Sequence, residues 1–401
     1  MDLEFVVIGC GNVGSNAIAL LSERGVKSAA VADTTGIYEV QNLEHLVKLK
    51  RHSIGLGRKM RLLEIVGIPG SKMKRIGDLN SEILQDVCDG KVVISALPTS
   101  PEFEPGAASY LNYHAVQKGK LCIAVDKSHV YPNAYDKLKE YITNGRFVPI
   151  GSILAPCQVW DLIRQASVEG GEGVVNGTTN YMVNRMGEGL GFESALQEAK
   201  SKGYADPHKA GLGFGDLVGL DASVKMMVLA RMMKPENAGV IPVVLELDGN
   251  RYRIDGGTEF VDDTSGEAVP GEKVYLEVRK ELEKIHKLKR EGKTIRQIAT
   301  IDGKIKVSFE KEDCKDFEDL TGTLNRLKIY CKGWAIDEKR LLEIYDEVHV
   351  DGKMATCSIK RLGTRWSVHI EENEDSLVVQ GPGAGALETA TSLVDACLRR
   401  I

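Results

Sequence analysis

The sequence predicts an α/β protein in which a parallel, doubly wound sheet is followed by an α+β domain. Over residues 1–150, short apolar runs alternate with helical patterns, which is typical of parallel strands joined by crossover helices. From residue 151 onward helical periodicity is more frequent, and the segment from about residue 300 to 375 is richer in strand-like alternation. The length of 401 residues leaves room for two domains, each with its own hydrophobic core.

The N-terminal domain is expected to span residues 1–150 and to be completed by residues 376–401. Short apolar runs predict its strands at Glu4–Ile8, Ala29–Asp33, Lys91–Leu97 and Leu121–Val125. Helices are predicted at Ser15–Glu23 and Ala107–Lys118, and the closing helix, Gly385–Arg399, is expected to return to this domain.

The second domain is expected to span residues 151–375. A strand should end at Gly173–Asn176, and helical periodicity predicts helices at Pro156–Ser167, Thr178–Met186, Glu193–Lys202 and Leu217–Met233. Alternation predicts later strands at Lys304–Phe309, Leu327–Cys331, Ala355–Lys360 and Trp366–Glu371. Residues 240–285 fit neither pattern and look like an insertion, although Val243–Leu247 is strand-like.

The composition is that of an ordinary globular enzyme, with 43% hydrophobic and 27% charged residues. The formal net charge of −5 is spread along the chain, so we expect no nucleic-acid partner. No apolar run approaches the roughly 18 residues of a membrane span, and the first residues lack the basic flank of a signal peptide. The eight cysteines stand singly without a C-x-x-C pair, which argues against a metal site and against disulfides. We therefore expect a soluble cytoplasmic protein.

A glycine-rich turn, Gly9-x-Gly11-x-x-Gly14, directly follows the first predicted strand and opens the first helix. In a Rossmann-type domain these glycines allow the tight turn, the approach of a pyrophosphate and close helix packing. The alternative is a plain glycine turn. Asp33 ends the second predicted strand about 20 residues on, where a carboxylate binds the adenosine ribose and favours NAD over NADP. NADP stays open, because several residues downstream could accommodate a phosphate, namely Thr34, Thr35, Lys48, Lys50 and Arg51.

Two lysines are candidate functional residues. Asp221 and Lys225 lie four residues apart and so share one helix face, which is largely apolar around them. An ordinary surface salt bridge is the alternative interpretation of this pair. Lys127 follows the strand Leu121–Val125 at the carboxyl edge of the predicted sheet, where ligands bind. For Lys127 the alternative is a solvent-exposed loop lysine.

Two further turns combine small residues with strand-to-helix junctions. Gly177-Thr178-Thr179 could bind a carboxylate through backbone N–H groups and a hydroxyl, or it could simply cap a helix. The turn Gly381–Gly385 precedes the closing helix and allows either close packing or a second approach to the cofactor.

In this order, the motifs resemble those of homoserine dehydrogenase. The family's Asn-Gly-Thr-x-x-Tyr signature stands as Asn176 to Tyr181, and its Gly-x-Asp-x-x-x-Lys signature as Gly219, Asp221 and Lys225. Its Asn-Lys pair appears as Asp126-Lys127. The Gly-x-Gly-Ala-Gly closing turn is present, and Asp33–Gly36 is similar to the Asp-Ser-x-Gly run of members without a fused kinase.

The resemblance implies a dimeric oxidoreductase that interconverts aspartate 4-semialdehyde and homoserine with NAD or NADP. It implies catalytic roles for Lys225, Lys127 and Asp221, and substrate contacts from Gly177, Thr178, Tyr204, Asp206 and Asp216. Together with the glycine turn, it implies a cofactor site formed by Gly9, Gly11, Asn12, Val13, Gly14, Asp33, Thr34, Ala96, Lys127 and Gly383.

Departures from the family pattern surround the substrate rather than the cofactor. Asp206 replaces a Glu, the loop Pro207–Gly215 is longer, and Gly151–Pro156 replaces a glycine-rich turn where some members bind a monovalent cation. Two alternatives therefore stay open. One is a dehydrogenase of a different amino-acid semialdehyde, and the other is a non-catalytic NAD-binding regulator.

Overall fold

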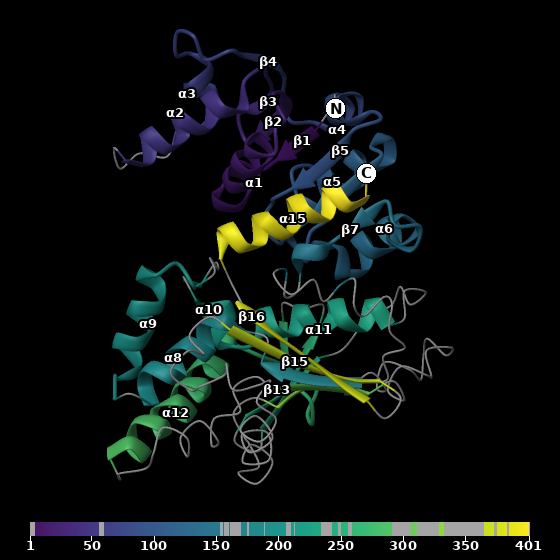
Figure 1. Ribbon diagram of the computed structural model, residues 1–401. Coiled ribbons are helices and arrows are strands. Elements are labelled where there is room, and N and C mark those ends of the chain that lie inside the picture. The colour runs from purple at the N-terminus through teal and green to yellow at the C-terminus, as the bar shows by residue number, and fades with distance from the viewer. Residues whose placement is uncertain are drawn as a thin grey trace. The chain divides into compact units, whose positions relative to one another are not determined.

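The computed structural model describes residues 5–55, 60–152, 155, 160, 170–174, 176–187, 189–205, 210–211, 213–233, 243–247, 250–255, 259–290, 306–310, 329–332, 365–372, 375–382 and 385–400. The chain divides into two compact units (Figure 1). Unit 1 comprises residues 1–161 and 385–401, and unit 2 comprises residues 162–384. The division into a nucleotide domain and a substrate domain, with the boundaries that the sequence suggested, stays a prediction.

Unit 1 contains a seven-stranded sheet in the order β4-β3-β2-β1-β5-β6-β7. Its strands are β1 (Phe5–Ile8), β2 (Ala29–Asp33), β3 (Gly36–Val40), β4 (Met73–Gly77), β5 (Val92–Ser95), β6 (Leu121–Ala124) and β7 (Phe147–Val148). The run from β2 through β1, β5 and β6 to β7 is parallel, as the sequence predicted.

Strands β3 and β4 depart from the predicted winding, because both pair antiparallel with their neighbours. Asp33 pairs with Gly36 across a two-residue turn, so β2 folds back as a hairpin instead of entering a crossover helix. Gly36 has φ +135°, a conformation that glycine adopts without strain. The antiparallel extension therefore follows directly from the Thr34-Thr35-Gly36 turn.

Helices pack on this sheet at α1 (Asn12–Glu23), α2 (Leu43–Gly55), α3 (Leu62–Val66), α4 (Ser81–Cys88), α5 (Ala108–Lys118) and α6 (Pro132–Thr143). Two 3₁₀ turns, η1 (Ser128–Val130) and η2 (Ile150–Ser152), complete the segment. The last helix, α15 (Ala386–Arg400), belongs to this unit, as the sequence predicted. It packs along α1 (Figure 1). Arg24 and Asp395 link the two helices at 3.0 Å.

The core of unit 1 is built from the parallel strands, which are buried on both faces. Every residue of β1, β5 and β6 is buried, which explains why these strands are continuous apolar runs instead of alternating ones. Full burial of one large aliphatic side chain such as Ile8 contributes about 1.5–3 kcal/mol to folding. The sheet is therefore a rigid platform for the loops at its carboxyl edge.

Unit 2 combines helices with a nine-stranded sheet in the order β12-β11-β10-β9-β14-β13-β8-β15-β16. The helices are α8 (Gly177–Gly187), α9 (Phe192–Ser201), α10 (Phe214–Leu217), α11 (Leu220–Met233) and α12 (Gly271–Arg290). The strands are β8 (Gly170–Val174), β9 (Val243–Leu247), β10 (Asn250–Asp255), β11 (Glu259–Asp262), β12 (Ala268–Val269), β13 (Lys306–Glu310), β14 (Ile329–Lys332), β15 (Arg365–Glu372) and β16 (Asp375–Pro382). Among the described strands of this unit, all pairings are antiparallel except that of β9 with β14.

Residues 240–285, which fitted no sequence pattern, supply β9 to β12 and the start of α12. These strands form an antiparallel meander at one edge of the sheet. Tyr275 of α12 stacks on Phe214 with ring centroids 5.7 Å apart, so the segment packs into its own unit. The strand expected at Val243–Leu247 is confirmed.

The predicted helix Leu217–Met233 is confirmed over Leu220–Met233, as α11, but it begins later than predicted, because a break at Val218–Gly219 separates it from the short helix α10. Gly219 in this break adopts φ +80°. The break is important because it lets Asp216 and Asp221 approach the same side chain. The predicted helix Pro156–Ser167 and the strand Ala355–Lys360 lie outside the described residues, apart from Trp160.

Candidate functional site

The glycine turn joins β1 to α1 in unit 1 and is constrained at two of its three glycines. Gly9 has φ +93°, and a Cβ there would lie 2.5 Å from the carbonyl oxygen of Ala96. A Cβ on Gly14 would lie 1.8 Å from the carbonyl oxygen of Gly9. Both positions therefore require glycine for packing. In contrast, a Cβ on Gly11 would meet nothing within 4 Å, so the space beside the turn is open.

That open space is a cavity of about 680 Å³, within the range of small-molecule and cofactor sites. Of the residues predicted to bind cofactor, the structure brings together on its walls Gly9, Gly11, Asn12, Asp33, Thr34 and Ala96. The N-terminus of α1 carries no acidic residue in its first turn, so its N–H groups and dipole favour an anion there. These residues fit the pyrophosphate and ribose of a dinucleotide.

Asp33 lies at this cavity with both carboxylate oxygens already accepting hydrogen bonds. Oδ1 accepts from the amide of Thr35 at 2.8 Å, and Oδ2 accepts from the amide of Leu62 at 2.9 Å. The carboxylate is thereby held in a fixed orientation, a condition for recognising a ribose diol.

Cations share the cavity with Asp33. Lys50, Arg51 and Arg61 line it, and Lys50 Nζ donates to the carbonyl of Cys10 at 3.1 Å. The sequence pointed to Lys50 and Arg51 but missed Arg61, because its approach depends on how the chain returns after α2. Lys48, which the sequence also suggested, pairs instead with Glu44 at 2.6 Å on an exposed helix face. Burial raises the pKa of the Cys10 thiol to about 12, so this cysteine stays protonated at the turn.

Of the four other predicted cofactor residues, the three that the structure describes do not line this cavity. Val13 and Gly14 belong to α1, where Gly14 permits the helix to pack against the turn. Lys127 lies after β6, at the carboxyl edge of the parallel sheet. Gly383 lies outside the described residues.

Lys127 is held by hydrogen bonds to its backbone. Its amide donates to Thr99 Oγ1 at 3.0 Å, and its backbone angles of φ −101° and ψ 6° fall in the sparsely populated bridge region. The preceding residue, Asp126, is 1% exposed and accepts from Asn112 Nδ2 at 2.7 Å. Burial raises the pKa of the Asp126 carboxyl, while these hydrogen bonds and the nearby Lys127 charge oppose the shift.

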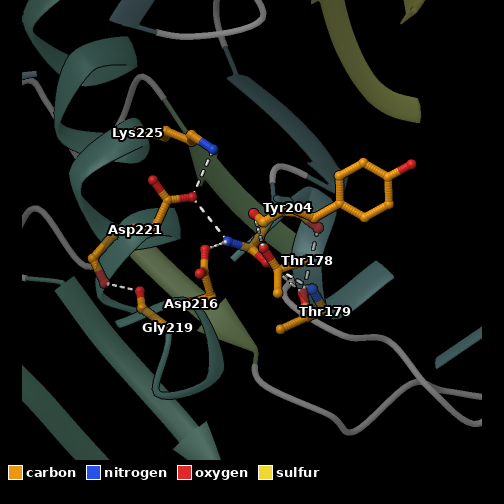
Figure 2. Close-up of polar contacts among 9 residues, drawn as sticks. Thr178, Thr179, Tyr204, Asp216, Gly219, Asp221 and Lys225 are labelled. Atoms are coloured by element: carbon orange, nitrogen blue, oxygen red, sulfur yellow. Dashed lines mark hydrogen bonds and ion pairs between the residues drawn. The ribbon is translucent and has the colours of Figure 1, made fainter. Parts of the chain in front are cut away.

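In unit 2, Asn176 is the centre of a buried polar cluster. Its Nδ2 donates to Asp216 Oδ1 at 2.7 Å and to Asp221 Oδ2 at 2.9 Å, and Lys225 Nζ lies 2.6 Å from the same Asp221 oxygen. Figure 2 shows Lys225 and Asp221 facing each other, with Asp216 beside them. The Lys225 and Asp221 side chains are each 9% exposed, so the surface salt bridge considered as the alternative is ruled out.

Asn176 also organises the start of α8. Its Oδ1 accepts from the amide and from the hydroxyl of Thr179, both at 2.9 Å, which caps the helix. The amide group of one side chain therefore joins the helix start to both carboxylates. The Asn-Gly-Thr-x-x-Tyr signature contains Asn176, but nothing in the sequence indicated that its side chain would bind both carboxylates and the start of α8.

Thr178 connects the same helix start to the Tyr204 loop. Its Oγ1 donates to the carbonyl of Tyr204 at 2.7 Å (Figure 2). The Tyr204 ring packs edge-on against Tyr181, with ring centroids 5.0 Å apart. Tyr181 in turn donates to Glu198 at 2.6 Å, and burial raises its pKa. The predicted substrate residues Gly177, Thr178, Tyr204 and Asp216 therefore come from adjoining elements, while Asp206 lies outside the described residues.

Comparison with known proteins identifies one family. A family model described as homoserine dehydrogenase matches residues 158–335. The NAD(+)-dependent homoserine dehydrogenase of Pseudomonas canavaninivorans is 26% identical over 239 residues, covering 57% of this chain and 65% of that protein. The homoserine dehydrogenase of Methanocaldococcus jannaschii is 24% identical over 253 residues, covering 59% of this chain and 70% of that protein. The match therefore spans slightly less than two thirds of the Pseudomonas relative.

Solved structures agree on the fold. A hyperthermophilic archaeal homoserine dehydrogenase in complex with NADPH superposes with a TM-score of 0.61 at 16% identity, covering 100% of this chain and 97% of that one. The homoserine dehydrogenase of Thermoplasma acidophilum gives a TM-score of 0.59 at 16% identity, with 100% and 99% coverage. None of the described helices has the length and apolar character needed to cross a membrane.

Proposed function

We propose that this chain, which belongs to the homoserine dehydrogenase family, interconverts L-aspartate 4-semialdehyde and L-homoserine with NAD(H) or NADP(H). The observation that carries the proposal is the buried cluster of Lys225, Asp221, Asn176 and Asp216. Burying charged side chains is costly, and paired buried charges are concentrated at functional sites. The cluster at the start of α8 therefore indicates a catalytic site.

Lys225 would meet the substrate oxygen. When an aldehyde is reduced, its oxygen gains negative charge, and a fixed ammonium both stabilises that charge and supplies a proton. Asp221 holds Nζ at 2.6 Å, which keeps the ammonium in place before the reaction. Lys127 is the second proposed proton donor, fixed by its own loop in unit 1.

The substrate's charged ends have partners in unit 2. The Asp216 and Asp221 carboxylates together with the Lys225 ammonium carry one net negative charge, which suits the substrate's ammonium group. The amides at the start of α8, from Gly177 and Thr178, would meet its carboxylate. Tyr204 and Asp206 complete the proposed substrate contacts.

The nicotinamide ring, when bound, supplies or accepts the hydride. The cavity walls of unit 1 would hold the rest of the cofactor, with the N-terminus of α1 at the pyrophosphate and Asp33 at the adenosine ribose. Asp33 favours NAD. Lys50, Arg51 and Arg61 on the same walls would accommodate a 2′-phosphate, so NADP use is the alternative.

Two other functions stay open. Asp206 in place of the family's Glu favours a different amino-acid semialdehyde as substrate. The second alternative is a non-catalytic NAD-binding regulator, and the buried lysine argues against it, because a regulator would not need one. We further propose a cytoplasmic homodimer, on the resemblance to the family alone.

The decisive experiment is a steady-state assay of wild-type protein with aspartate semialdehyde and either NADH or NADPH, followed by nucleotide absorbance. Lys225→Ala should lower kcat by about 100-fold or more, since a preorganised charge at a developing oxyanion is lost, while NADH binding stays within about twofold. Lys280→Ala, which removes an exposed lysine of α12, is the matched control and should turn over normally. Wild-type protein without turnover on any semialdehyde would leave the regulator as the better account.

A further inference from the structure

Asp126 carries a buried carboxyl that the proposed reaction does not use. It follows β6 at the carboxyl edge of the parallel sheet, directly before Lys127, and is 1% exposed. Burying a carboxylate is costly unless hydrogen bonds replace its water, so the surrounding donors explain why the residue is tolerated there.

Those donors come from two different elements. Asn112 of α5 donates its Nδ2 to Asp126 Oδ2 at 2.7 Å, and the amide of Ser128 donates to Oδ1 at 3.0 Å. Both carboxylate oxygens therefore act as acceptors. Oδ2 binds the side chain of α5, and Oδ1 binds the backbone of the turn around Lys127.

The turn at residues 126–128 is also hydrogen-bonded to the loop that follows β5. The amide of Lys127 donates to Thr99 Oγ1 at 3.0 Å, and the amide of Ser100 donates to Ser128 Oγ at 2.8 Å. The two amides that flank the Lys127 α-carbon, its own and that of Ser128, are thus both bonded to side chains. This bonding holds Lys127 in the bridge conformation, with φ −101° and ψ 6°.

We propose that Asp126 is a positioning residue, whose two acceptor oxygens fix the 126–128 turn and thereby direct the Lys127 side chain. The inference rests on the proposed function, in which Lys127 assists proton transfer. In this role the side chain at position 126 must accept hydrogen bonds, and its negative charge is not required.

The neighbouring amide makes this distinction testable. Within the described residues, Asn112 Oδ1 has no hydrogen-bond partner. With Asn at position 126, one oxygen would still accept from Ser128, and Asn112 could turn its amide to present Oδ1 to the new NH₂ group. Asp126→Asn therefore preserves the turn, whereas Asp126→Ala removes both acceptors.

The first test is steady-state kinetics of the full-length protein. We expect Asp126→Ala to lower kcat by about 10- to 100-fold, as for a displaced catalytic group, with NADH binding unchanged, and Asp126→Asn to stay within about threefold of wild type. Ser109→Ala is the matched control, because it removes another side-chain hydrogen bond of α5, the partly buried one from Ser109 to the carbonyl of Glu102 at 3.0 Å, and it should leave kcat unchanged. Equal loss in the Asn and Ala variants, or normal kcat in the Ala variant, would overturn the proposal.

A second readout does not depend on the substrate. The rate of reductive methylation of Lys127, measured by peptide mass spectrometry across pH, should be the same in wild type and Asp126→Asn and altered in Asp126→Ala. If the Ala variant does not fold, Thr99→Val replaces it. This variant removes the acceptor for the Lys127 amide without changing Asp126, and we expect it to alter the pH profile of Lys127 methylation in the same way. An unchanged profile in a folded Ala or Val variant refutes the positioning role, whereas absent wild-type turnover refutes only the proposed function.

Discussion

At the scale of single residues, the Asp126 carboxyl should leave a signature in the pH dependence of stability. Burial raises its pKa in the folded protein above the ordinary value of 3.8. In the unfolded chain this carboxyl ionises near pH 3.8, whereas in the folded protein it stays protonated up to its raised pKa. The contribution of the protonated carboxyl to the free energy of unfolding is therefore lost as pH rises from 3.8 to the raised pKa.

We therefore predict that the free energy of unfolding of Asp126→Asn, relative to wild type, increases as pH rises through that window and is constant above it. Urea unfolding between about pH 4 and pH 8 measures the difference. A difference that falls with rising pH would mean that the carboxylate is stabilised in the folded state, contrary to its burial.

Residue identities in the candidate site were partly predictable from the sequence. Asp221 and Lys225 could be paired from helical spacing, and their pairing at 2.6 Å confirms the shared face. Asn176 could not be recognised as the hub, because the approach of Asp216 and Asp221 to it depends on the chain break at Gly219. Contacts that join elements 40 or more residues apart have no local pattern in the sequence.

At the scale of elements, the glycine turn allows two closely matched substitutions with opposite outcomes. Gly14→Ala places a methyl group 1.8 Å from the Gly9 carbonyl oxygen, so α1 must move away from β1. We predict a loss of about 1–3 kcal/mol or more in the free energy of unfolding, as for an overpacked core.

Gly11→Ala is the control for that prediction, because its methyl group meets nothing within 4 Å. This variant should unfold at nearly the wild-type temperature and bind NADH more weakly, since the methyl group enters the space proposed for the pyrophosphate. Thermal denaturation and NADH titration separate the two effects. Normal stability in Gly14→Ala would contradict the packing account of this glycine.

The strands that the sequence predicted well are those with fully buried apolar runs, such as β1 and β6. Strands β3 and β4 were missed. The reason for β4 is that it is largely exposed at the sheet edge and carries the polar run Lys74-Arg75. Amphipathic helices such as α4 and α6 lie between the predicted strands and were not distinguished from loops. An edge strand gains its conformation from its neighbour's hydrogen bonds and needs no apolar pattern of its own.

At the scale of the whole molecule, the cavity proposed for the cofactor belongs to unit 1 and the Asn176 cluster to unit 2. We predict that NADH alone slows amide hydrogen exchange at Gly9–Ser15 and Met60–Leu62, where the cavity walls lie. Addition of homoserine should extend protection to Gly177–Thr179 and Asp221–Lys225. Glu272–Lys280 of α12, which contributes no residue to the cavity walls, serves as the internal control. Absence of protection at Gly9–Ser15 would contradict the proposed cofactor site.

Because α15 is synthesised after the whole of unit 2, the N-terminal sheet emerges from the ribosome long before the helix that covers it. Ala390, Leu393 and Val394 are buried on the face of α15, and α1 is among the elements against which that helix packs. A nascent chain would therefore expose this flank throughout the translation of unit 2. Chaperone dependence during biosynthesis, and sensitivity to premature termination near the 3′ end of the message, follow from this order of assembly.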